Sequence, residues 1–184
     1  MIHYWPFIGN YNDAISNANL FNGKNNSLIS DRFNRTNSSL YLNYGYLQVP
    51  NGYYIYGDFT LTTWVKMYTL EPGRRFFRMI SSNENMILFS LTLNQGTGPY
   101  LFYNGMNYAA NTSLVIGKWQ HLAFTSKGST FLMYIDGICV YNGDFYSDVY
   151  FGQFTLPNAE FDDIKIFNRS LTQTEIIQSS FNNF

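Results

Sequence analysis

Residues 130–141 read TFLMYIDGICVY, two short apolar-rich runs joined by Asp136 and Gly137. An Asp-Gly pair supplies the positive φ angles that a two-residue hairpin turn requires. The stretch therefore predicts a β-hairpin with strands at 130–135 and 138–141. Residues 119–125, WQHLAFT, predict a further strand just upstream.

The clearest single strand is predicted at residues 59–67, FTLTTWVKM, because its residues alternate between two faces. One face carries Phe59, Leu61, Val65 and Met67, and the other carries Thr60, Thr62 and Lys66, with Trp64 among them. Further strands are predicted at 86–93, 150–156 and 161–167, with weaker candidates at 39–49, 76–80 and 99–103.

A helix is predicted only near the C-terminus. Thr172 and Glu175 have the spacing of a capping box, and a short apolar face of about two turns follows them. Since strands and helices do not alternate, a parallel α/β sheet is not expected. The pattern predicts an all-β, two-sheet antiparallel jelly-roll sandwich with a short C-terminal helix. We expect one domain over residues 1–184, with the Asn- and Ser-rich residues 10–38 forming a long packed loop.

Composition narrows the possible functions. The 184 residues carry a net charge of -1, and charged residues make up 12% of the chain, about half the usual share. This near-neutral charge removes the electrostatic drive toward nucleic acid, and the apolar runs are too short to span a membrane. The first residues lack the basic and apolar segments of a signal peptide. Five N-x-S/T sequons favour an exported protein, and they begin at Asn25, Asn34, Asn37, Asn111 and Asn168.

Three segments resemble laminin-G-like, concanavalin-A-like domains: GDFTLTTWV (57–65), GKWQHLAF with LMYIDG (117–124 and 132–137), and DDIKIFNRSLTQTEI (162–176). Trp5-Pro6-Phe7 with Asn12-Asp13 is similar to the opening of the jelly-roll subgroup. The resemblance implies a jelly-roll sandwich. It does not choose a function, because the family includes lectins, adhesion modules, toxin domains and enzymes.

Catalytic residues are not apparent. Glycosidases on the related glucanase sandwich carry a Glu-x-Asp-x-Glu strand, and the nearest match here begins at Glu160 and lacks the third acid. The four Glu residues show no strand-period pair. We therefore expect no enzyme, and a glycoside hydrolase is the weakest alternative.

The resemblance implies a structural Ca²⁺, which is bound by hard oxygen ligands. Asp162 or Asp163 in the closing strand, with Asn12 or Asp13 near the N-terminus, would supply those oxygens and clamp the two ends of the domain. Alternatively, the two closing aspartates pair with Arg169 or accept hydrogen bonds from backbone N–H groups.

Aromatic side chains beside amides suggest a ligand surface, because sugar rings stack on aromatic faces while amides bind hydroxyls. The candidate residues are Tyr54, Tyr56, Tyr103, Asn104, Asn107 and Tyr108. Strand-period spacing would place Tyr54 and Tyr56 on one face. Tyrosine is also a common packing residue in strands, so half-buried packing is the alternative.

The leading hypothesis is a non-enzymatic recognition or adhesion module that binds a glycan or a protein at an extracellular or displayed surface. A structural assembly subunit, such as a virion-surface, capsid-associated or filament protein forming homo-oligomers, is the alternative, because low charge and abundant aromatics also suit protein contacts.

Overall fold

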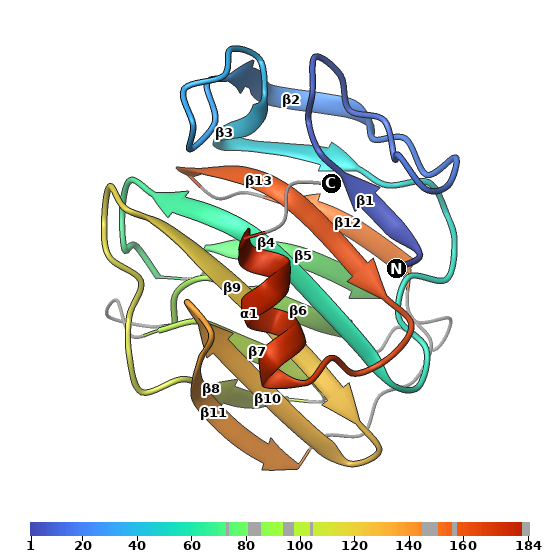
Figure 1. Cartoon of the computed structure of the whole chain (residues 1–184), viewed down its shortest axis with the longest axis vertical. Coiled ribbons are helices and arrows are strands. Elements are labelled where there is room, and N and C mark those ends of the chain that lie inside the picture. Colours follow the sequence, from blue (N-terminus) through green and yellow to red (C-terminus); the bar gives the residue numbers. More distant parts are fainter. Residues whose placement is uncertain are drawn as a thin grey trace.

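The computed structural model describes residues 1–72, 74–80, 86–93, 98–103, 105–144, 151–155 and 158–181. Within these ranges the chain forms strands and one helix (Figure 1). The elements are β1 (His3–Trp5), β2 (Phe21–Ile29), β3 (Ser39–Gln48), β4 (Phe59–Met67), β5 (Arg75–Ile80), β6 (Met86–Ser90), β7 (Tyr100–Tyr103), β8 (Met106–Ala109), β9 (Trp119–Lys127), β10 (Thr130–Ile135), β11 (Ile138–Asp144), β12 (Phe151–Thr155), β13 (Asn158–Phe167) and α1 (Gln173–Phe181).

The strands form two antiparallel layers, which confirms the predicted all-β sandwich. The first sheet has the order β11-β10-β9-β4-β13-β3, with β1 paired to β13 and β2 paired to β3. The second sheet has the order β3-β12-β5-β6-β7-β8. Strand β3 belongs to both sheets, so the hydrogen-bonded ladder is continuous between the layers.

Strand β3 passes from one sheet to the other at Tyr44 and Gly45. Its first half pairs with β13, for example Leu42 with Ala159, and its second half pairs with β12. Tyr44 has a φ of 52°, and a Cβ on Gly45 would lie 2.2 Å from the carbonyl oxygen of Lys24. Only glycine fits this close approach, so the position bends the strand without a steric clash.

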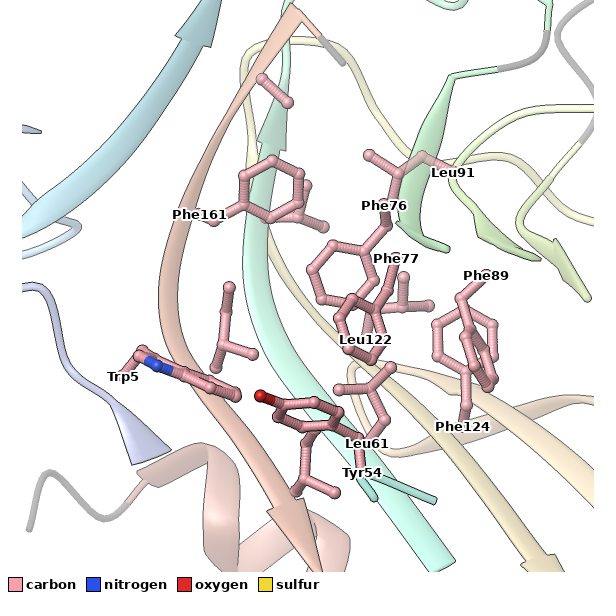
Figure 2. Packing of buried hydrophobic residues seen from close by; sticks show 14 of the residues in the cluster. Trp5, Tyr54, Leu61, Phe76, Phe77, Phe89, Leu91, Leu122, Phe124 and Phe161 are labelled. Carbon is pink, nitrogen blue, oxygen red and sulfur yellow. The ribbon is translucent and has the colours of Figure 1, made fainter. Parts of the chain in front are cut away.

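The core lies between the two sheets and is rich in phenylalanine (Figure 2). Phe59 and Phe124 of the first sheet meet Phe89 of the second, with ring centroids 6.0 and 5.0 Å from that of Phe89. Phe76 stacks on Phe161 at 5.1 Å. All five rings are at most 1% exposed, and burial of each contributes about 1.5–3 kcal/mol to folding.

Helix α1 covers the outer face of the first sheet, where Ile176 packs with Ala123 and Tyr134 (Figure 1). The predicted capping box is confirmed: the Thr172 amide donates to Glu175 Oε2 at 2.8 Å, and the Glu175 amide donates to Thr172 Oγ1 at 3.3 Å. In the described ranges, no helix has the length and apolar character needed to cross a membrane.

The predicted hairpin at 130–141 is confirmed, with φ angles of 50° at Asp136 and 76° at Gly137. The prediction that residues 10–38 form only a loop is wrong, because Phe21–Ile29 is strand β2. This edge strand pairs with β3 through an irregular register and is mostly exposed. Its polar sequence therefore lacks the apolar alternation that marks a strand.

Candidate functional site

A groove lies on the outer face of the first sheet, beside the C-terminal end of α1. It consists of three adjoining hollows of about 280, 370 and 480 Å³. The first two share Trp64 and Trp119, and the second and third share Arg32 and Trp119. We call this surface the Trp64–Trp119 groove. Its principal lining residues are Asp31, Arg32, Phe33, Asn34, Trp64, Lys66, Lys118, Trp119, His121, Asp136, Glu160, Ile177, Ser180 and Phe181.

Strand pairing brings the central groove residues together. Trp64 and Lys66 lie two residues apart in β4 and so share a face, which is the face that lines the groove. Lys66 pairs with Trp119 of β9 on one side and with Glu160 of β13 on the other. The Lys66 Nζ atom lies 2.8 Å from Glu160 Oε2 and 5.4 Å from the centroid of the Trp119 ring. This part of the groove therefore combines the indole ring of Trp119 with the ion pair between Lys66 and Glu160.

Arg32 anchors the loop after β2 against the sheet. Its guanidinium forms ion pairs with Asp162 and Asp163, the second at 2.8 Å, and its side chain is 6% exposed. The guanidinium carbon also lies 4.6 Å from the Phe33 ring centroid and 4.9 Å from the Trp64 ring. These contacts place the guanidinium against both aromatic rings of the groove.

A bulge in β13 explains how two adjacent carboxylates reach one guanidinium. Alternation would send Asp162 and Asp163 to opposite faces, but the register shifts there and Asp163 has a φ of 50°. Burial, with a smaller contribution from the neighbouring Asp163 charge, raises the pKa of Asp162 to about 7. The positive charge of Arg32 opposes this rise. The Tyr4 hydroxyl donates to Asp163 Oδ1 at 2.5 Å, and burial is the main cause of the raised pKa of Tyr4.

His121 lies at the floor of the groove, 2% exposed, with its ring 5.5 Å from that of Trp64. Burial, together with the positive charges of Lys165 and Arg32, lowers the pKa of His121 to about 3, so the imidazole is neutral near pH 7. The structure describes no hydrogen-bond partner for His121 Nδ1 or Trp64 Nε1. Both atoms are buried, so a ligand hydroxyl could reach them only if neighbouring side chains moved.

The predicted calcium ligands have different partners, although Tyr4 contacts both Asp13 and Asp163. Asp13 accepts hydrogen bonds from the Tyr4 amide at 2.9 Å and the Ser16 hydroxyl at 2.5 Å, while Asn12 is exposed. These and other hydrogen bonds outweigh the effect of burial and hold the pKa of Asp13 below its ordinary value.

Asp162 and Asp163 pair with Arg32, whereas Arg169, the partner considered from sequence, pairs with Glu175. In the part of the chain that the structure describes, no three His, Cys, Asp or Glu side chains form a group suited to a metal ion. The calcium site stays a prediction, and Ca²⁺ at the closing aspartates would have to displace Arg32.

The expectation that Tyr54 and Tyr56 share a face is wrong. Tyr54 is 2% exposed, donates a hydrogen bond to the Pro50 carbonyl at 2.6 Å, and lies beside Trp5 in the core (Figure 2). Tyr56 is 75% exposed. The spacing argument fails because this segment is not a regular strand: Ile55 makes only an isolated bridge. Tyr54 therefore has a packing role and offers no ring face to a ligand.

The other candidates from sequence lie on or near the β7–β8 hairpin of the second sheet. Tyr103 pairs with Met106, and Asn107 is exposed. Tyr108 is half-buried with its ring edge-on to Tyr141 at 6.4 Å. Asn104 lies outside the described residues. The structure thus places Tyr103, Asn107 and Tyr108 on one hairpin of the second sheet, whereas the Trp64–Trp119 groove lies on the first sheet.

Sequence reasoning missed the groove itself. One signal was available, namely a large indole at Trp64 on the strand face that otherwise carries Thr60, Thr62 and Lys66. Arg32 gave none, because it lies in a loop and meets its aspartate partners 130 and 131 residues later in the chain.

Solved structures share this architecture. Domain 4 of AbnA, a GH43 extracellular arabinanase from Geobacillus stearothermophilus, in complex with arabinotriose, matches with a TM-score of 0.80 and 16% identity over 97% of both chains. A Trypanosoma rangeli sialidase matches with a TM-score of 0.66 and 16% identity, over 95% of this chain and 31% of that one. The binding domain of botulinum neurotoxin serotype G matches with a TM-score of 0.62 and 16% identity, over 96% and 50%.

At these identities the likeness shows the fold alone. No protein with a curated description matches the sequence. A family model described as the Concanavalin A-like lectin/glucanases superfamily matches residues 42–177. That range includes most strands of both sheets and the first half of α1. The chain belongs to the concanavalin A-like lectin/glucanase superfamily, as a laminin-G-type domain.

Proposed function

We propose that the chain is a non-enzymatic module that binds a glycan in the Trp64–Trp119 groove. The observation that carries this proposal is the convergence of two of the three tryptophans, Trp64 and Trp119, on one hollowed surface beside ordered polar groups. The third, Trp5, is fully buried in the core.

The aromatic residues favour a sugar ligand. Indole faces contact the C–H faces of pyranose or furanose rings, while nearby polar groups hold the hydroxyls. Phe33 and Phe181, 54% and 78% exposed, extend the apolar surface. The three adjoining hollows give room for several linked sugar rings.

The polar groups are held before a ligand arrives, which lowers the entropy cost of binding. Arg32 is fixed by two aspartates, and Lys66 is held between Glu160 and the aromatic rings of Trp119 and Tyr68. Charged groups with fixed directions form strong hydrogen bonds to sugar hydroxyls.

The comparisons support a secreted sugar-binding role. Domain 4 of the extracellular arabinanase spans the same length as this chain and was solved with a trisaccharide. The five sequon asparagines of this chain are all exposed, which agrees with an extracellular or displayed location.

Two of the three groove carboxylates, Glu160 and Asp31, are buried and held within the chain, which supports binding without cleavage. Glycoside hydrolysis requires a pair of carboxyl groups that reach the scissile bond. Glu160 is 2% exposed and is held by Lys66 and the Tyr68 hydroxyl. Asp31 is 4% exposed and accepts hydrogen bonds from Phe33 and Arg35. We expect no release of reducing sugar from any glycan that binds.

A glycan array followed by calorimetric titration, with arabinotriose as the first probe, tests the proposal. Trp119→Ala should weaken binding at least about tenfold, a loss of roughly 1.4 kcal/mol. Tyr56→Ala is the matched control, because Tyr56 is an exposed aromatic outside the groove.

Equal loss in both variants, or no glycan bound by the wild type, would contradict the proposal. Capture of a protein partner that Trp119→Ala abolishes would favour protein recognition by the same surface instead.

A further inference from the structure

We infer that the groove selects neutral glycans over acidic ones. This inference rests on the proposed glycan-binding function and adds the chemical class of the ligand. Its basis is the charge of the groove and the way in which that charge is already paired within the chain.

The groove has no net charge. Its lining contains three positive side chains, Arg32, Lys66 and Lys118, and three negative ones, Asp31, Asp136 and Glu160. An acidic sugar would add a carboxylate to a surface with no excess of cations. Taking that carboxylate out of water without a compensating partner is unfavourable.

Two of the three groove cations, Arg32 and Lys66, already form ion pairs with carboxylates of the chain. Arg32 forms ion pairs with Asp162 and Asp163, which are themselves 1% and 6% exposed. Lys66 lies 2.8 Å from Glu160 Oε2. A ligand carboxylate at either cation would share that cation with a carboxylate of the chain, and the two negative charges would repel each other in a partly buried site. A ligand hydroxyl can donate and accept hydrogen bonds without breaking either pair.

The remaining ionisable groups do not change this balance. Lys118 is exposed, so water and salt screen its charge. His121 at the floor is buried beside Trp64 and is held neutral, so it adds no cation near neutral pH. Neutral sugars therefore match the groove better than uronic or sialic acids.

Matched glycan pairs separate this inference from the proposed function. Oligogalacturonate is compared with its neutral methyl ester, sialyllactose with lactose, and a panel of neutral oligosaccharides with their carboxylated analogues. We expect each bound neutral glycan to exceed its acidic partner at least about tenfold in affinity. We also expect little dependence of neutral binding on NaCl between about 0.05 and 0.5 M, since a neutral ligand gains no net charge attraction for salt to screen.

Acidic glycans that bind as well as their neutral partners would overturn the inference and leave the proposed function intact. Failure of every glycan to bind would overturn both.

Charge substitution gives a second, independent readout. Glu160→Gln keeps the size of the side chain but leaves Lys66 without its carboxylate, so the ratio of acidic to neutral binding should rise at least about fivefold. Glu71→Gln is the matched control, because Glu71 pairs with Arg74 in an ion pair outside the groove. An equal change of the ratio in both variants, or no change in either, would contradict the inference.

Discussion

Two arginine–carboxylate clusters lie on the outer side of the first sheet, near opposite ends of α1, and they differ in burial. Near the C-terminal end, Arg32 and its partners Asp162 and Asp163 have side chains at most 7% exposed. Near the N-terminal end, Arg169 and Glu175 are 54% and 35% exposed. The buried cluster forms part of the wall of the groove, whereas the exposed pair lies on the surface beside the first turn of α1.

This difference in burial predicts a difference in energy. An exposed ion pair gains little, because water and salt screen it and two long side chains lose freedom. Removing one partner from a buried pair lowers the stability of the fold strongly, because the remaining charge then lies in an apolar environment. The same chemistry thus stabilises the wall of the groove at one end of α1 and contributes little at the other.

The largest effect is expected from Arg32→Met, which leaves two buried carboxylates without their guanidinium. We expect the free energy of unfolding to fall by about 2–3 kcal/mol. Urea denaturation near pH 7 measures this loss.

Arg169→Met is the control and should leave the free energy of unfolding nearly unchanged. Similar values for the two variants would mean that burial does not distinguish the two clusters.

A smaller effect is expected from pH, through Asp162. Burial raises the pKa of Asp162 to about 7 in the folded chain, against about 3.9 when unfolded. The folded state therefore binds more protons between these values, and this contribution to stability is lost as the pH rises through 7. His121, whose pKa is lowered to about 3, acts in the opposite direction below about pH 6.5.

Asp162→Asn isolates the first contribution. We expect the stability of this variant, relative to the wild type, to increase between pH 5 and pH 8, as measured by urea denaturation across that range. A relative stability that does not change with pH would show that Asp162 does not titrate in this range.

The fold could be predicted from the sequence because the signals that specify it are local. Each signal consists of residues that are close together in the sequence, as in the Asp136-Gly137 turn, the alternating strand around Trp64 and the capping box at Thr172. Strand β2 was missed because an exposed edge strand requires no apolar alternation. The bulge at Asp163 was missed because strand alternation places adjacent side chains on opposite faces.

The candidate site was harder to predict, because its parts meet only through tertiary structure. Arg32 lies in a loop far from its aspartate partners in the sequence. Trp119 and Glu160 lie on either side of Lys66 in the intervening strand β4. The sequence predicts a ligand surface at tyrosine-rich segments instead, yet Tyr54 is a core residue. Aromatic content alone did not distinguish packing residues from surface residues.

The smallest effect is expected from chelation. Because Arg32 already pairs with Asp162 and Asp163, we expect EDTA to leave the melting temperature unchanged in a thermal scan without added metal. A fall in melting temperature that Ca²⁺ reverses would instead support the calcium prediction, and Asp13→Asn and Asp163→Asn would then show which carboxylate is involved.

Tryptophan fluorescence tests the central claim most directly. Trp64 and Trp119 line the groove, and Trp5 is fully buried, so emission changes during a glycan titration report on the groove. With a neutral oligosaccharide selected on the array, we predict a saturable change in emission for the wild type and none for the variant carrying Trp64→Phe and Trp119→Phe. Calorimetric binding with unchanged wild-type emission would place the ligand elsewhere and contradict the account.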